Sequence, residues 1–107
     1  MILIVYRRGE HTLSIHGHAG AGEPGHDPVC AAVSILAYTL ADFVRTSHHA
    51  KQVKRPVVQM EPGDTVISCK PRPDTKAAVS LVFDAICGGF ALLERDYPEN
   101  IVFNVLP

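Results

Sequence analysis

HDPVCAAVS, residues 26–34, carries the signals that begin a long helix, and the other elements can be laid out on either side of it. Aspartate is a favoured N-cap, and proline is favoured at the first helical position because its missing N–H would have no partner there. We therefore predict a helix from Pro28 to about Thr46. The apolar side chains that recur at helical spacing and predict its core-facing stripe are Val29, Ala32, Val33, Leu36, Leu40, Phe43 and Val44.

The segments around this helix predict strands. Residues 2–7 are rich in β-branched and aromatic side chains, and residues 12–18 alternate after a turn at Gly9 and Glu10, so the chain begins with a β-hairpin. A second hairpin is predicted from residues 57–60 and 65–70, which flank the turn sequence PGD. A polar, basic linker is expected before it, from Ser47 to Arg55, and a last strand at residues 101–106.

A second helix is predicted after Asp74, which we expect to be its N-cap. Its apolar side chains form two stripes, Ala78, Leu81, Val82, Ala85, Gly89, Leu92 and Leu93 on one side and Val79, Phe83, Ile86 and Phe90 on the other. A helix that is apolar on two sides is either deeply sandwiched or half buried against a second subunit, and in so small a domain we favour the subunit interface. We therefore expect a homodimer with Phe83 and Phe90 on the dimer face.

The predicted order is ββαββαβ, which gives a two-layer α+β domain over residues 1–107, with two helices covering a mixed or antiparallel sheet. At 107 residues and 47% apolar composition, the chain can form one core without metal or disulfide staples. A net charge of −1 argues against a dedicated nucleic-acid surface. The odd number of cysteines indicates reduced thiols. The opening apolar run is too short for a signal peptide, and we expect no membrane span. We therefore expect a cytoplasmic protein.

Cys30 falls in the first turn of the first helix, where unpaired N–H groups and the positive end of the helix dipole favour the thiolate. A free cysteine on a helix is most often a small buried hydrophobe. Its place at the helix start, offset from the apolar stripe, favours a nucleophile instead. Cys69 and Cys87 lack such a position, and we expect both to be packing residues.

Three blocks of this sequence, Gly17-His18-Ala19, Asp27, and Val29-Cys30-Ala31-Ala32-Val33-Ser34, resemble the signature of the bacterial ribosomal-processing cysteine proteases. The resemblance implies a catalytic dyad of His18 and Cys30, an acyl-enzyme, no cofactor and a homodimer. It also implies a substrate: the N-terminal extension of a large-subunit ribosomal protein that lies near the peptidyl-transferase centre. Pro28 departs from the family pattern, which usually has a branched aliphatic residue there, and helix-start geometry accepts the proline.

Around the dyad we expect supporting roles. His18 takes the thiol proton and returns it to the leaving amine, and His26 is the competing base. Asp27 caps the helix or orients His18, and we favour the cap. The backbone N–H groups of Cys30 and Ala31 are the expected oxyanion donors. Ser34 lies one turn after Cys30, where it supports the thiolate, lines the pocket or bonds back to a carbonyl. The loop 19–25, with Gly20, Gly22 and Gly25, is the expected substrate lid.

Two other classes of function remain open at this point. His16, His18, His26 and Cys30 include ligand types that suit zinc, although their spacing matches no established zinc module. The second alternative is a small α+β binding module without catalytic activity, in which Cys30 is incidental. Under the protease reading the partner is the tail of a ribosomal protein, with no direct contact with nucleic acid or membrane.

Overall fold

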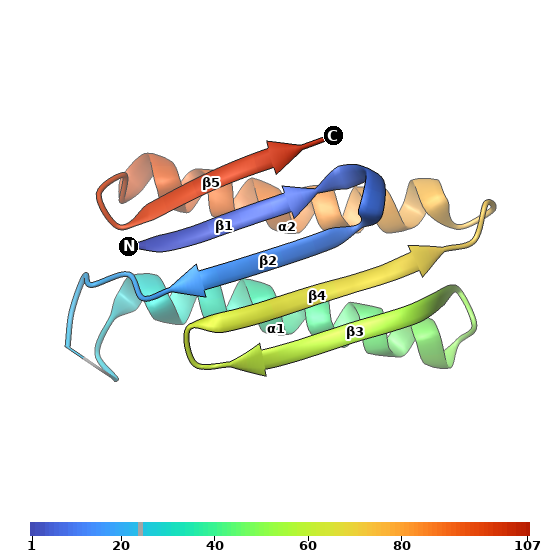
Figure 1. Cartoon of the computed structure of the whole chain (residues 1–107), viewed down its shortest axis with the longest axis horizontal. Coiled ribbons are helices and arrows are strands. Elements are labelled where there is room, and N and C mark those ends of the chain that lie inside the picture. Colours follow the sequence, from blue (N-terminus) through green and yellow to red (C-terminus); the bar gives the residue numbers. More distant parts are fainter. Residues whose placement is uncertain (24) are drawn as a thin grey trace.

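The structure is a computed structural model that describes residues 1–23 and 25–107. Its elements are β1 (Ile2–Arg7), a 3-10 turn (Arg8–Glu10), β2 (Thr12–Gly17), α1 (Pro28–His49), β3 (Val53–Glu61), β4 (Asp64–Pro71), α2 (Lys76–Asp96) and β5 (Ile101–Leu106). The strands form one sheet in the order β3-β4-β2-β1-β5, and both helices lie on the same face of it (Figure 1). The predicted two-layer α+β fold and its element order are confirmed.

The centre of the sheet explains how the layers pack. β1 pairs with β2 in antiparallel register and with β5 in parallel register. Ile2, Ile4 and Tyr6 are buried, because alternate side chains of a strand point to one face and this face is covered by the helices. Each large apolar side chain buried in this way contributes about 1.5–3 kcal/mol. The buried residues of the helices are Val29, Val33, Ala37, Leu40, Ala41 and Val44 of α1 and Val79, Phe83, Ile86, Cys87 and Phe90 of α2.

The connection between α1 and β3 is shorter than predicted. α1 continues past Thr46 to His49, and the helix closes with hydrogen bonds from the N–H of Ala50 to the carbonyls of Thr46 and His48. β3 begins at Val53, and its first part pairs with β4 across a register shift between Lys54 and Val57. Polar residues therefore extend both elements here, since backbone hydrogen bonding continues where the apolar pattern has ended.

The start of α2 also differs from the prediction. Asp74 does not cap the helix, because its carboxylate accepts a hydrogen bond from Nε of Arg72 at 2.9 Å. Thr75 is the N-cap residue and makes no side-chain cap bond. Its hydroxyl donates instead to the carbonyl of Gln52 at 2.7 Å, which ties the start of α2 to the residue before β3.

The two stripes of α2 have opposite environments. Phe83 and Phe90 are 0% exposed and belong to the core of this chain, whereas Leu81 and Leu92 on the other stripe are 69% and 54% exposed. The predicted dimer face was therefore the wrong one. The pattern alone left two apolar sides equivalent, and only the position of the sheet distinguishes them.

Both helices are long and apolar. Windows of 18 residues within α1 and α2 have a mean hydropathy of 1.4 and 1.7, which by length and composition is enough to cross a membrane. The expectation that no segment reaches this length was wrong. In this fold each helix packs one side on the sheet, as the core helices of compact domains do.

Candidate active site

The first turn of α1 is held by the carboxylate of Asp27. Its Oδ1 accepts the backbone N–H of Val29 at 2.9 Å and that of Cys30 at 3.0 Å, and its Oδ2 accepts the N–H of Ala21 at 3.0 Å. The bond from the Cys30 N–H, followed by those from Ala21 and Val29, lowers the pKa of the Asp27 carboxyl. The predicted cap is confirmed. Both oxygens are bonded to the backbone, and among the described residues no hydrogen bond joins Asp27 to His18.

His18 and Cys30 line the same pocket, which has a volume of about 330 Å³. It lies at the end of the sheet where β2 stops, α1 begins and the β3–β4 turn returns, close to the N-terminus (Figure 1). The fold thus brings together two residues that are twelve positions apart. The apolar side chains that line the pocket include Ile2, Ile15, Val33, Ala37 and Met60, and the acidic ones are Glu61 and Asp64.

The imidazole of His18 rests on the turn between β3 and β4. A Cβ on Gly63 would lie 2.8 Å from Nε2 of His18, and Gly63 has a φ of +74°. The carbonyl of Gly63 accepts the N–H of Gly17 at 3.0 Å, and the amino group of Met1 donates to the carbonyl of His18. The left-handed backbone favours glycine at position 63, and a side chain there would displace the His18 ring.

Ala19 makes a contact that no pattern in the sequence predicts. Its backbone N–H lies 3.5 Å from Sγ of Cys30, and its carbonyl accepts Nδ2 of Asn100 at 2.9 Å. An N–H aimed at the sulfur favours a negative charge there. Ala19 and Asn100 are separated by 81 residues, and neither residue type carries a local signal for this role.

The predicted oxyanion donors are not free in this structure. The N–H of Cys30 donates to the carboxylate of Asp27, and the N–H of Ala31 donates to the Asp27 carbonyl at 3.1 Å. The N-cap and the first helical bond thus use both groups here, and their role as oxyanion donors stays a prediction. Among the residues that the structure covers, the backbone N–H directed at the Cys30 sulfur is that of Ala19.

The other candidate residues are distributed around the pocket. Ser34 is exposed and lines it with Cys30. His26 is exposed and is not among the lining residues, and Nδ1 of His16 lies 3.1 Å from Oδ1 of Asp64. Within residues 1–23 and 25–107, no three His, Cys, Asp or Glu side chains are grouped so that they could hold a metal ion. The zinc alternative therefore lacks a ligand set in that part of the chain.

The glycines of the loop 19–25 have different surroundings. Gly20 and Gly25 have φ of +69° and +83° with open space where a Cβ would be. A Cβ on Gly22 would lie 2.8 Å from the carbonyl oxygen of His26, so the loop folds back on the start of α1. The predicted lid includes residue 24, which lies outside the described residues, and the lid function stays a prediction.

Cys69 and Cys87 are buried in the core, as predicted. Burial raises the pKa of the Cys69 thiol to about 11, and burial together with Asp84 raises that of Cys87 to about 12. Both side chains therefore remain thiols at neutral pH. Cys30 is partly exposed at the pocket, which separates it from the other two cysteines.

No curated protein compared with the chain is a match. The structure is similar to the essential ribosomal processing protease Prp of S. aureus with a covalently linked product peptide, at a TM-score of 0.77 and 24% identity, covering 98% of this chain and 99% of the other. The same protease with a substrate peptide gives 0.71 and 23%, with the same coverage. A Streptococcus mutans protein gives 0.67 and 28%, covering 98% and 91%.

Prp structures with a peptide and this chain thus share one architecture along their whole lengths. The sequence pattern of the family described as cysteine protease Prp matches residues 1–102, which include both candidate catalytic residues and nearly all of the fold. From this match the chain belongs to the Prp family of cysteine proteases.

Proposed function

We propose that this protein is a cysteine endopeptidase that removes the N-terminal extension of a large-subunit ribosomal protein, with Cys30 as nucleophile and His18 as general base and acid. The observation that carries the proposal is the shared pocket: His18 and Cys30 line it from two elements, and Cys30 stands in the first turn of α1. Family membership supports the reaction. The S. aureus relative, a ribosomal processing protease, supports the substrate.

The reaction proceeds in two steps. Cys30 transfers its thiol proton to His18 while its sulfur attacks the peptide carbonyl carbon, and the C–N bond breaks as His18 returns the proton to the departing amine. A thioester to Cys30 remains. Water then attacks the thioester, His18 takes a proton from the water, and the carboxyl product leaves as the thiol is restored.

The surroundings of the dyad have complementary tasks. Asp27 fixes the first turn of α1 and with it the backbone of Cys30. The Ala19 N–H stabilises negative charge at the sulfur, and Asn100 holds the Ala19 peptide in place. Ser34 supports the thiolate side of the pocket, and the loop 19–25 closes over a bound peptide.

The pocket suits a peptide with an apolar side chain near the cleaved bond and a positive charge close by. Its interior is lined by side chains such as Val33 and Met60, and its acidic residues are Glu61 and Asp64. β3 is an edge strand and ends at Glu61, beside the pocket. An extended peptide can therefore add to the β3 edge through backbone hydrogen bonds, which leaves alternate side chains to give specificity.

We propose further that the protein is a cytoplasmic homodimer that uses no cofactor. The dimer surface is the outer side of the helices, where the large apolar residues Ile35, Tyr38, Leu81 and Leu92 are exposed. Three free cysteines are consistent with a reducing compartment.

The test is incubation of the purified protein with the source organism's ribosomal protein carrying its N-terminal extension, followed by mass spectrometry of the products. Wild type is expected to release one N-terminal peptide, and Cys30→Ala and His18→Ala to release none while keeping the wild-type circular dichroism spectrum. Cleavage by Cys30→Ala would overturn the proposal. No cleavage by wild type, together with slow alkylation of Cys30, would favour a binding module.

A further inference from the structure

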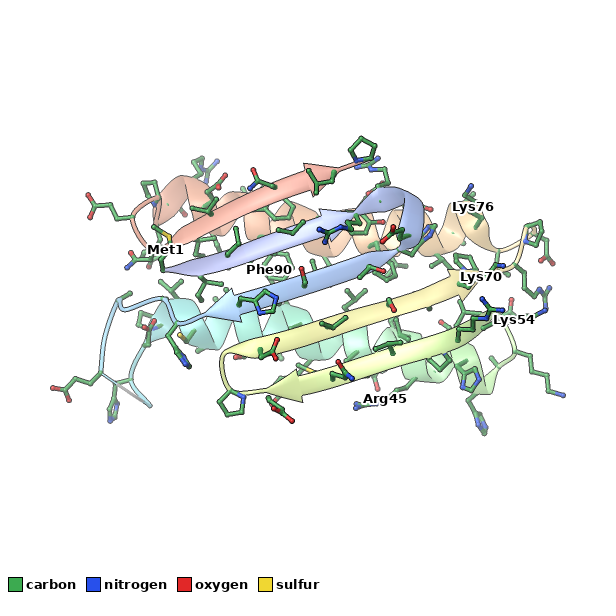
Figure 2. All side chains as sticks on the ribbon, viewed as in Figure 1. Met1, Arg45, Lys54, Lys70, Lys76 and Phe90 are labelled. Carbon is green, nitrogen blue, oxygen red and sulfur yellow. The ribbon has the colours of Figure 1, made fainter. Side chains whose placement is uncertain are left out.

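The charged side chains are separated along the longest dimension of the molecule, which extends 42 Å. Seven of the eleven carboxylates lie in the half that contains the pocket: Glu23, Asp27, Glu61, Asp64, Glu94, Asp96 and Glu99. Nine of the ten lysines and arginines lie in the opposite half: Arg7, Arg8, Arg45, Lys51, Lys54, Arg55, Lys70, Arg72 and Lys76. The net charge of −1 is therefore an average over two ends of opposite sign. Figure 2 shows Lys54, Lys70 and Lys76 at the end of the sheet opposite to Met1.

A groove of about 490 Å³ lies at the basic end, and Arg55, Lys70 and Lys76 line it together with a single carboxylate, Glu10. The cations beside the groove are partly neutralised: Arg8 pairs with Asp84 at 3.1 Å, and Arg72 pairs with Asp74. No ion pair between described residues involves Arg55, Lys70 or Lys76. These three cations are thus available to a ligand.

The backbone places two of these cations at the groove in specific ways. Arg55 has a φ of +50° inside the register shift between Lys54 and Val57, and a bulge of this kind redirects the side chain of an edge strand. Lys76 is the first residue of α2, whose N-cap Thr75 makes no side-chain cap bond, so the positive end of that helix lies at the same place.

The pKa of His11 is affected by its burial and by the positive charge at this groove. His11 lines the groove, and its Nε2 lies 2.7 Å from Oγ of Ser80. Burial lowers the pKa of His11, and the charge of Lys76 lowers it further. A histidine held neutral in this way keeps a hydrogen bond to Ser80 and leaves the positive charge of the groove to its lysines and arginine.

We propose that this groove binds the phosphate backbone of RNA, so that the enzyme docks on RNA with its basic end while the pocket end takes the peptide. The chemistry is phosphate recognition by lysine and arginine, which supplies affinity without base readout. Further cations continue from the groove over the same end, as Lys51 and Lys54 do, and this suits repeated phosphates better than one small anion. The choice of RNA over another polyanion rests on the proposed function, since an enzyme that processes a ribosomal protein encounters its substrate close to RNA. The expectation of no contact with nucleic acid was inferred from the net charge of the whole chain, which does not describe the local charge of this groove.

The test measures binding of a short fluorescent single-stranded RNA of mixed sequence by anisotropy at several salt concentrations. The groove variant carries Arg55→Gln, Lys70→Gln and Lys76→Gln. The control variant carries Arg7→Gln, Arg45→Gln and Arg95→Gln, which makes the same change in net charge outside the groove. Thermal melts of both variants establish that they fold.

The groove variant is expected to bind at least about tenfold more weakly and to reduce the slope of log K against log salt by about 2, as three lost phosphate contacts on a single strand require. The control variant is expected to stay close to wild type. Equal weakening by both variants, no weakening by the groove variant, or displacement of the RNA by a poly-glutamate peptide of equal charge would overturn the proposal. Binding is measured without peptide substrate, so failure here is distinct from failure of cleavage.

Discussion

Gly63 supports the imidazole of His18 so closely that a Cβ on Gly63 would lie 2.8 Å from the ring nitrogen Nε2. The two residues come from different elements, since Gly63 forms the turn between β3 and β4 and His18 follows β2. The turn is itself bonded to β2, because the N–H of Gly17 donates to the Gly63 carbonyl at 3.0 Å. The β3–β4 hairpin therefore positions the candidate base.

Gly63→Ala is expected to lower the rate of peptide cleavage by about 10-fold to 100-fold, because displacement of a catalytic group by about 1 Å costs this much. The new Cβ must push the His18 ring away from the turn. A second effect is backbone strain at a φ of +74°, which lowers stability by about 1 kcal/mol. Steady-state kinetics and a thermal melt measure the two effects separately.

Gly20→Ala is the matched control for the stability effect of Gly63→Ala. Gly20 has a similar φ of +69°, but nothing lies within 4 Å of its Cβ position. It therefore introduces the same kind of backbone strain without contact with His18, and its thermal melt gives the cost of that strain. Cleavage by Gly63→Ala at the wild-type rate would contradict the role given to Gly63.

Asp27 makes the stability of the protein depend on pH. The bond from the Cys30 N–H, with those from Ala21 and Val29, lowers the pKa of Asp27 in the folded state below its usual 3.8. A carboxyl with a lowered pKa stabilises the fold above its unfolded pKa, and this stabilisation is lost as the pH falls through the folded pKa. Asp27→Ala is therefore expected to have a lower Tm than wild type at neutral pH, with a difference that shrinks in strong acid.

Asp27→Asn separates the cap from the charge, because asparagine caps helices about as well as aspartate. Its Tm at neutral pH should lie between those of wild type and Asp27→Ala. Thermal melts of the three proteins across the acid range measure both effects. A difference between wild type and Asp27→Ala that stays constant down to the lowest pH would contradict the assignment.

The sequence predicted most of the fold, because its signals are local. The Asp27-Pro28 helix start, the PGD turn and the alternation in β2 each depend on neighbouring residues and were all observed. The start of α2 was missed because Arg72 competes for the carboxylate of Asp74. The buried side of α2 was missed because both of its stripes are apolar.

The candidate site was predictable where one segment contains it. His18, Asp27 and Cys30 stand within thirteen residues, and the helix-start pattern and the family resemblance both point to them. Asn100 and Gly63 reach the site only through the tertiary fold, so no local pattern marks them. Which helix-start N–H groups serve the cap depends on the folded loop, so the assignment of the oxyanion donors stays a prediction.

The three cysteines are expected to react with iodoacetamide at very different rates at neutral pH. Burial raises the pKa values of Cys69 and Cys87 to about 11 and about 12, and it also blocks the reagent, whereas Cys30 is partly exposed. Peptide mapping by mass spectrometry should find early label on Cys30 alone, and none in native Cys30→Ala. Similar rates for all three cysteines in the folded protein would contradict the claim that the position of Cys30 at the helix start makes its thiol reactive.

Leu81→Glu combined with Leu92→Glu is expected to convert a dimer to a folded monomer, as measured by sedimentation and circular dichroism. The two side chains lie on the exposed stripe of α2. Val57→Glu, which adds a charge to the open face of the sheet, should remain dimeric. Phe83→Glu is no test of the interface, since a charge at this fully buried position destabilises the chain itself by several kcal/mol. A monomeric wild type, or dissociation by Val57→Glu alone, would contradict the proposed surface.

The central claim is that peptide cleavage passes through a thioester on Cys30, and the most direct measurement is mass spectrometry of the enzyme quenched with acid during turnover. Wild type should carry the mass of the N-terminal product fragment on the peptide that contains Cys30, and this mass should disappear as the substrate is consumed. His18→Ala should form the thioester far more slowly. Cleavage that proceeds with no adduct on Cys30, or with an adduct on another residue, would contradict the account.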